Sequence, residues 1–185
     1  EDIEADEFKA HYLGKLKEAT RMINEQIEFT SVYQNIGLQK PQWYELYALM
    51  EQVKTQIPGV SVKFVNELEV ARIFADPMLE RALYNLFDNT VRYGKKAATI
   101  RSYYYVGEDS MRWIVEDDGV GVAPEDKNRI FNKGYGNNTG LGLFLVREIL
   151  SITDCSIIEN GETGTGARFE ISIPPGQYNI LQADR

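Results

Sequence analysis

The sequence contains very few of the residues that commonly bind metals or cross-link chains. Its 185 residues include one cysteine, Cys155, and one histidine, His11. A single cysteine excludes an internal disulfide framework and a zinc site built from several cysteines. No apolar run approaches the eighteen residues that a membrane-spanning helix needs. We therefore expect these residues to lie in a reducing, cytoplasmic compartment, whether or not the parent protein is tethered to a membrane.

Positive charge is also scarce. Twenty Lys and Arg residues face 28 Asp and Glu residues, which gives a formal net charge of −8. Because nucleic-acid-binding domains usually carry a basic surface, no nucleic-acid partner is expected. Hydrophobic residues make up 43% and charged residues 26%, an ordinary globular balance. The length fits one globular domain with a small appendage.

The segment from about Asp6 to Tyr33 predicts one long amphipathic helix. The chain begins with Glu1 rather than methionine, so we expect an excised fragment of a longer protein. A solitary amphipathic helix needs a cover, which is either the body of the domain or a helical bundle with another chain or a missing helix; the length favours the bundle. The apolar positions recur at helical spacing and are Phe8, Tyr12, Leu13, Leu16, Ala19, Ile23 and Ile27.

The rest of the chain predicts helices interleaved with strands, and therefore an α+β fold in which a layer of helices covers one sheet. In chain order we expect a turn over 34–41, a helix over 43–57, strands over 60–65 and 70–75, a helix from an Asp76-Pro77 cap to Tyr93, a hairpin of strands 98–106 and 112–116, a Gly- and Asn-rich loop over 118–139, a helix over 141–152, and strands over 156–159 and 167–173.

Two asparagines stand out in the helix that ends at Tyr93. Asn85 and Asn89 are four residues apart, so their carboxamides project from the same face. A carboxamide oxygen is a hard, neutral ligand that suits Mg²⁺, and Arg92 follows within a turn to meet phosphate oxygens. Alone, the segment is more typical of a helix with ordinary solvated asparagines.

An acidic turn follows the second strand of the expected hairpin. The strand delivers Asp117 into a turn that contains Gly119 and Gly121. A carboxylate there can accept a hydrogen bond from an exocyclic amine such as that of adenine, and glycines let the backbone approach a flat ring. The alternative is an acidic surface turn.

The loop over 118–139 leads into a third motif. Gly140, Leu141 and Gly142 precede a helix whose first backbone N–H groups can bind phosphate. The alternative is a flexible loop before a buried helix. Neither a Walker A pattern nor G-x-G-x-x-G occurs, so the usual nucleotide-binding folds are not supported.

In this order and spacing, the three segments resemble the N, G1 and G2 boxes of GHKL-type ATP-binding domains, and most of all the catalytic domain of sensor histidine kinases. Residues 129–131 resemble the F box of the lid, and residues 164–169 the last glycine-rich turn. The match covers about Trp43 to Pro174. It implies a two-layer α/β sandwich with a mixed sheet, a protein histidine kinase activity, and ATP with Mg²⁺ as the bound species.

The resemblance implies roles for individual residues. Asn89 would coordinate Mg²⁺, Asn85 would assist at metal or phosphate, and Asp117 would accept from the adenine amino group. Ala167 stands where the family often has threonine, which removes one hydroxyl contact, and Asn138 stands where many members have glycine. The other implied ATP contacts are Arg92 at the phosphates, Tyr93 against adenine, Gly119 and Gly121 around the base, Phe131 and Lys133 in the lid, and the backbone N–H groups of Gly140, Leu141 and Gly142.

The resemblance also implies a phosphoacceptor histidine followed by an acidic residue and a nearby proline. His11 has neither, so we expect a structural histidine there and no autophosphorylation of this chain. Residues 1–36 resemble instead the second helix of a dimerisation and phosphotransfer hairpin, and residues 37–185 the ATP-binding catalytic domain. The implied partners are a second copy, bound through the N-terminal helix, and the receiver domain of a response regulator.

Two other functions remain open. One is an ATP-hydrolysing GHKL machine, in which Asp88 would be the general base that activates water. The other is a non-catalytic module that binds ATP or a partner.

Overall fold

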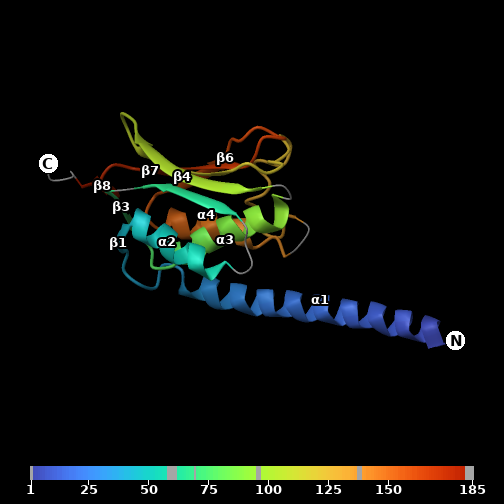
Figure 1. Ribbon diagram of the computed structural model, residues 1–185. Coiled ribbons are helices and arrows are strands. Elements are labelled where there is room, and N and C mark those ends of the chain that lie inside the picture. Colours follow the sequence, from blue (N-terminus) through green and yellow to red (C-terminus); the bar gives the residue numbers. More distant parts are fainter. Residues whose placement is uncertain (1, 58–61, 69, 95–96, 137–138, 182–185) are drawn as a thin grey trace.

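The computed structural model describes residues 2–57, 62–68, 70–94, 97–136 and 139–181. Figure 1 shows a sheet, a layer of helices beneath it, and a long N-terminal helix that runs along the helical layer and projects beyond it. The elements are α1 (Asp2–Asn35), β1 (Gln42–Glu45), α2 (Leu46–Gln56), β2 (Lys63–Glu67), β3 (Ala71–Ala75), α3 (Leu79–Tyr93), β4 (Thr99–Val106), β5 (Met111–Asp117), α4 (Gly142–Ser151), β6 (Ser156–Glu159), β7 (Arg168–Ile173) and β8 (Tyr178–Ile180).

The main sheet is mixed, with the strand order β2-β4-β5-β7-β6. Strands β2 and β4 are parallel and the other neighbours are antiparallel. The predicted hairpin is present as β4 and β5, in a register that pairs Ile100 with Asp117 and Val106 with Met111. The predicted α+β fold, a helical layer on a mixed sheet preceded by a long helix, is confirmed.

The core lies between this sheet and helices α2, α3 and α4. Trp113 of β5 is fully buried, and its indole Nε1 donates to Ser102 Oγ at 2.8 Å. Ser102 Oγ donates in turn to the carbonyl of Ile114 at 3.0 Å, so the buried polar atoms are satisfied. Helix α3 turns Leu83 and Phe87 into this core, each contributing about 1.5–3 kcal/mol through burial.

A second, three-stranded sheet of order β1-β3-β8 corrects part of the sequence interpretation. Trp43 and Tyr44, predicted to be helical, lie in β1 instead, and the Trp43 ring packs against Phe74 of β3 at 5.4 Å. Antiparallel pairing with β3 outweighs the local helical spacing. Strand β8 had no predicted counterpart. Residues 60 and 61 of the strand predicted over 60–65 lie outside the described residues.

Helix α3 begins at Leu79, later than the Asp76-Pro77 cap predicted. Asp76 is buried, and its Oδ1 accepts from the backbone N–H of Met78 at 2.8 Å. Its Oδ2 accepts from the N–H of Gly37 at 2.9 Å. Asp76 therefore joins the turn after α1 to the approach of α3, instead of capping the helix.

Helix α1 lies on the side of the helical layer that faces away from the sheet (Figure 1). Its C-terminal part packs on the body through buried Phe29, whose ring lies 6.2 Å from that of Phe144. Glu28 and Glu25 pair with Arg81 and Arg92 of α3 at 2.8 and 3.2 Å. Among the described residues, no helix combines the length and hydrophobicity needed to cross a bilayer.

Candidate nucleotide-binding site

The two asparagines of α3 lie beside the start of α4. Asn85 is buried, and its Nδ2 donates to the carbonyl of Gly142 at 3.3 Å. Within the part of the chain that the structure describes, Asn89 Nδ2 is buried and has no hydrogen-bond partner. An unsatisfied buried amide has a cost, so this group is poised for an acceptor from outside the protein.

Asp117 ends β5 and is held by three hydrogen bonds. Its Oδ1 accepts from the backbone N–H groups of Gly119 at 2.9 Å and Ala167 at 3.1 Å. Its Oδ2 accepts from the hydroxyl of Thr90 on α3 at 2.8 Å. The backbone N–H of Asp117 also donates to the Ala167 carbonyl at 2.9 Å. The carboxylate is therefore fixed between α3, the acidic turn and the last glycine-rich turn.

A close approach of two backbones sets the distance between α3 and the acidic turn. A Cβ on Gly119 would lie 2.7 Å from the carbonyl oxygen and 2.8 Å from the Cα of Gly94, the residue after α3. Only a glycine fits at Gly119 without moving Gly94. Gly121 lies on the other side of the turn, against the backbone of Glu162 and Gly166.

The third motif begins helix α4. Gly140 has φ +62°, and its carbonyl accepts from the N–H of Gly134 at 3.0 Å, which folds the loop back on itself. A side chain at Gly140 would overlap the backbone of Tyr135. Leu141 occupies the N-cap position and has no side chain that could cap the first N–H groups of α4. Gly142, the first residue of α4, faces the side chain of Asn85.

The lid loop is anchored at Phe131. This ring is buried, and it meets Phe169 edge-on with centroids 6.4 Å apart. Lys133 is exposed, and its Nζ lies over the rings of Phe29 and Tyr33 at 5.4 and 6.0 Å. Here Lys133 faces aromatic rings of α1.

A buried ion pair that the sequence interpretation missed holds the base of the same loop. The Glu159 side chain is completely buried and pairs with Lys127. Glu159 Oε1 also accepts from the N–H groups of Gly161 at 3.0 Å and Arg168 at 3.1 Å. No sequence motif signals this pair, which joins positions 32 residues apart.

Arg92 and Tyr93 lie at the end of α3. Arg92 Nε pairs with Asp88 at 2.7 Å and its NH1 with Glu25 of α1 at 3.2 Å. Desolvation works against charging Arg92, but the hydrogen bonds that its guanidinium donates to Asp88 and Glu25 prevail and raise its pKa, so the guanidinium stays charged. Tyr93 is 40% exposed. The predicted phosphate-binding cation is thus paired with acids in this arrangement.

Asp118, next to the predicted base-recognition residue, has a different role. Its Oδ1 accepts from the N–H groups of Ala98 at 2.6 Å and Thr99 at 2.9 Å. Partial desolvation opposes the effect, yet these backbone hydrogen bonds lower the pKa of Asp118. Asp118 therefore fixes the start of β4, whereas Asp117 faces α3.

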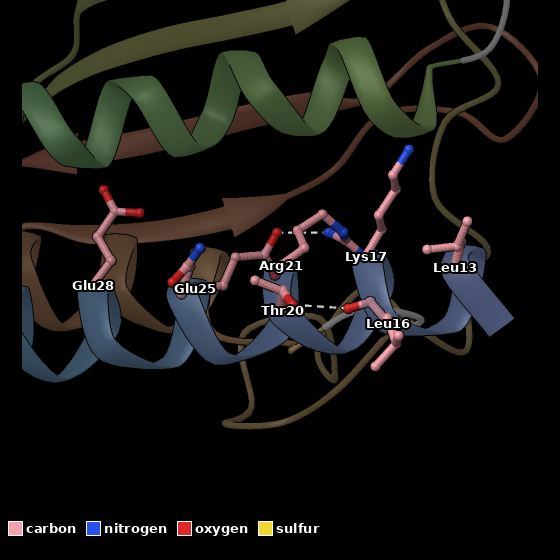
Figure 2. Close-up of a pocket in the computed structure, with 8 residues that line it drawn as sticks. Leu13, Leu16, Lys17, Thr20, Arg21, Glu25 and Glu28 are labelled. Atoms are coloured by element: carbon pink, nitrogen blue, oxygen red, sulfur yellow. Dashed lines mark hydrogen bonds and ion pairs between the residues drawn. The ribbon is translucent and has the colours of Figure 1, made fainter.

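Two hollows lie near the candidate site, and neither is lined by both Asp117 and the asparagines of α3. One, of about 520 Å³, lies at the strand ends and includes Asp117, Gly166 and Arg168. The other, of about 490 Å³, follows α1, and Figure 2 shows Lys17 and Glu28 reaching from it toward α3.

The donor set fits a magnesium–phosphate complex. The described residues contain no cluster of three His, Cys, Asp or Glu side chains that could hold a metal by themselves. Mg²⁺, however, commonly keeps several waters and takes its other ligands from phosphates. The orphaned Nδ2 of Asn89 can donate to a phosphate oxygen, and its carbonyl Oδ1 is the atom that could ligate Mg²⁺.

Residues 75–177, more than half of the chain, match the family described as histidine kinase-, DNA gyrase B-, and HSP90-like ATPase. The chain belongs to this ATPase family. The matched residues include α3, the acidic turn, the lid loop and α4. They therefore contain every residue of the candidate site named above except those contributed by α1.

Sensor proteins are among the relatives of this ATPase-family chain. It is 27% identical over 182 residues to the sensor protein KdpD of Escherichia coli strain K12, covering 92% of this chain and 20% of KdpD. It is 31% identical over 126 residues to the sensor histidine kinase CusS of the same strain, covering 63% of this chain and 26% of CusS. The chain thus spans about a quarter or less of the length of these relatives.

Solved structures share the fold, including the long helix. Full-length ShkA in complex with AMPPNP superposes with a TM-score of 0.70 at 22% identity, covering 94% of this chain and 40% of ShkA. The Acinetobacter baumannii histidine kinase AdeS superposes with a TM-score of 0.65 at 21% identity, covering 91% and 84%.

Proposed function

We propose that this chain is the Mg-ATP-binding catalytic domain of a two-component sensor histidine kinase, which donates the γ-phosphoryl group to a histidine outside these residues. Family membership and the sensor relatives support the kinase assignment. The observation that carries it is the fixed carboxylate of Asp117, which faces α3 on one side and the glycine-rich turn on the other.

In this proposal the base binds between Asp117 and the last turns of α3, and the phosphates bind between α3 and the start of α4. Asp117 accepts from the adenine amino group, with Gly119 and Gly121 shaping the base pocket and Tyr93 packing on the ring. Asn89, assisted by Asn85, holds Mg²⁺, which would supply charge neutralisation at the phosphates when bound. The N–H groups of Gly140, Leu141 and Gly142 bind phosphate oxygens at the start of α4.

Two cationic residues complete the proposed phosphate-binding site. Arg92 and Lys133 are the cationic side chains proposed to meet phosphate, and both contact α1 in this structure, so each would have to leave that contact to do so. Their protonated nitrogens would stabilise charge on the transferred group, and Phe131 would hold the lid loop in place. Phosphoryl transfer depends mainly on such positioning and charge, so these residues need no covalent role.

His11 is poorly placed to receive the phosphoryl group. It is exposed on α1, fourteen residues before Glu25, where the helix contacts α3. That separation is about 21 Å along the helix axis. We therefore propose that the acceptor histidine belongs to another helix of the intact protein, with a receiver domain as the next acceptor and a second copy bound through α1.

Isothermal titration calorimetry with ATP and MgCl₂ tests the proposal. The wild-type chain should bind ATP, and Asp117→Asn should weaken binding roughly 10- to 100-fold, the effect of losing a hydrogen bond to a charged group. The matched control is Asp118→Asn, which should stay within about twofold because Asp118 serves β4. No ATP binding by the wild type, or equal effects of both variants, would contradict the assignment.

Hydrolysis by Asp88 is the second candidate function. Asp88 lies directly before Asn89, but its Oδ2 is paired with Arg92 at 2.7 Å. The ion pair occupies an oxygen that a general base would present to water. We expect no steady ATP hydrolysis, and hydrolysis abolished by Asp88→Ala would favour the ATPase alternative.

A further inference from the structure

Thr90 has a contact that the motifs do not account for. It is 6% exposed on α3, between Asn89 and the end of the helix. Its hydroxyl donates to Asp117 Oδ2 at 2.8 Å, across 27 residues of sequence. The contact links the helix that carries the asparagines to the carboxylate proposed to recognise the base.

Other helical threonines of this chain bond within their own helix. The hydroxyls of Thr20 and Thr30 donate to the carbonyls four residues earlier, at 2.8 and 2.9 Å. The hydroxyl of Thr55 donates to the carbonyl three residues earlier at 2.7 Å. Such local bonds are the usual outcome for threonine in a helix. Thr90 instead directs its hydroxyl to another element, so its hydrogen bond is part of the Asp117 site.

The hydrogen bonds of Asp117 determine which oxygen can meet a ligand. An ionised carboxylate offers two acceptor positions on each oxygen. On Oδ1 both are taken, by the N–H groups of Gly119 and Ala167. On Oδ2 one is taken by Thr90. The remaining acceptor position of the carboxylate therefore lies on Oδ2, beside the Thr90 hydroxyl.

We propose that Thr90 is a positioning residue that orients Asp117 Oδ2 toward the base, and so sets the preference for a 6-aminopurine over a 6-oxopurine nucleotide. This inference rests on the proposed function. Ala167 contributes a backbone N–H to Asp117, so the hydroxyl at this carboxylate comes from α3.

The chemistry of the two purines explains the expected preference. The 6-amino group of ATP can donate to Oδ2, whereas the 6-oxo group of ITP places an acceptor opposite an acceptor. An oriented carboxylate that is left unpaired in this way disfavours the wrong base strongly. Without the Thr90 hydroxyl, Oδ2 has two open positions that water can fill, and the carboxylate loses its bond to α3.

The test compares Thr90→Val, which keeps the branched shape without the hydroxyl, with Thr90→Ser, which keeps the hydroxyl. Affinities for ATP and ITP are measured by calorimetry with MgCl₂. We expect the ATP affinity of Thr90→Val to fall about tenfold while ITP changes less than twofold, so that the ATP:ITP ratio falls about tenfold. Thr90→Ser should keep the wild-type ratio within about twofold. Thr90→Ala, which also lacks the hydroxyl but favours the helix, replaces Thr90→Val if that variant does not fold.

The outcomes distinguish a failure of the role proposed for Thr90 from a failure of the proposed function. A wild-type preference for ATP that persists in both Thr90→Val and Thr90→Ala overturns the role of Thr90 and leaves the proposed function intact. A loss of the preference in Thr90→Ser equal to that in Thr90→Val also overturns it, because the hydroxyl would not be the cause. A wild-type chain that binds neither nucleotide overturns the proposed function and this inference together.

Discussion

Helix α1 has an outer part, residues 2–20, and an inner part, residues 21–35, which carry similar apolar residues in different surroundings. In the outer part, Phe8 is 63% and Leu16 62% exposed. In the inner part, Phe29 is 6% exposed and packs against Tyr33 and Phe144. The acidic residues Glu25 and Glu28 of the inner part also contact the body of the domain, because they form ion pairs with arginines of α3. The docked face of the inner part is therefore not the predicted apolar stripe, because Ile27 of that stripe is 63% exposed beside Phe29.

Helical periodicity alone therefore does not reveal what covers a helix. The sequence left open whether the body of the domain or a bundle covers the N-terminal helix. The inner part packs on the body through Phe29, while the predicted apolar stripe is exposed along both parts, from Phe8 to Ile27. A stable helix needs a cover for such a face, which is consistent with the proposed second copy. Substitutions in matched pairs can test this division.

The largest expected effect is at Phe29. Phe29→Ala should weaken the docking of the inner part of α1 by about 3 kcal/mol, because a buried phenylalanine is replaced by a cavity. Amide hydrogen exchange over residues 29–35 measures the docking free energy. The matched control, Phe8→Ala, should change it by less than about 0.5 kcal/mol. Equal effects at the two positions would contradict the conclusion that the inner part of α1 is docked and the outer part is not.

The next effect is at Glu25, which pairs with Arg21 at 2.6 Å and with Arg92 at 3.2 Å. Glu25→Gln should weaken docking by about 1 kcal/mol, since the pair is only partly exposed and Arg92 keeps Asp88. The same exchange measurement at low and high salt checks the electrostatic origin. Glu18→Gln in the outer part is the control, and an effect there as large as at Glu25 would count against a specific contribution of the Glu25–Arg92 ion pair to docking.

A smaller effect is expected at Glu28. Its ion pair with Arg81 is 2.8 Å long, but 53% of the Glu28 side chain is exposed. Glu28→Gln should therefore weaken docking by about 0.5 kcal/mol or less. Thermal unfolding followed by circular dichroism should give a midpoint close to that of the wild type, and a large fall would assign more to this pair than its exposure allows.

The smallest effect on stability is expected in the outer part. Leu16→Glu exchanges one good helix former for another at an exposed position and should change the unfolding free energy by less than about 0.5 kcal/mol. Sedimentation velocity should nevertheless show weaker self-association than for the wild type. Unchanged association would argue against the outer part of α1 as the contact between copies.

Much of the architecture is predictable because its signals are local. The hairpin of β4 and β5, the loop after Asp117 and helix α4 follow from alternation, glycine content and a continuous apolar run. Residues Trp43 and Tyr44 were predicted wrongly, since apolar spacing there fits a helix until β3 is available as a partner. Strand β8 has three residues, too few for a period to be recognised.

The candidate site shows the same limit. The spacing of Asn85 and Asn89 and the turn after Asp117 are visible in the sequence, and their roles remain predictions. The ion pair of Asp88 with Arg92 could have been found from its four-residue spacing. The contacts of Thr90 with Asp117 and of Lys127 with Glu159 depend on residues that only the folded chain brings together.

The burial of Trp113 gives the molecule an internal optical reporter. Its indole is shielded and hydrogen-bonded to Ser102, whereas the other tryptophan, Trp43, is 49% exposed at the edge of the small sheet. Native fluorescence therefore combines a blue-shifted emitter with a water-exposed one. An aqueous quencher such as iodide will quench the fluorescence of Trp43 first. A red shift of the Trp113 emission will report loss of the core without any label.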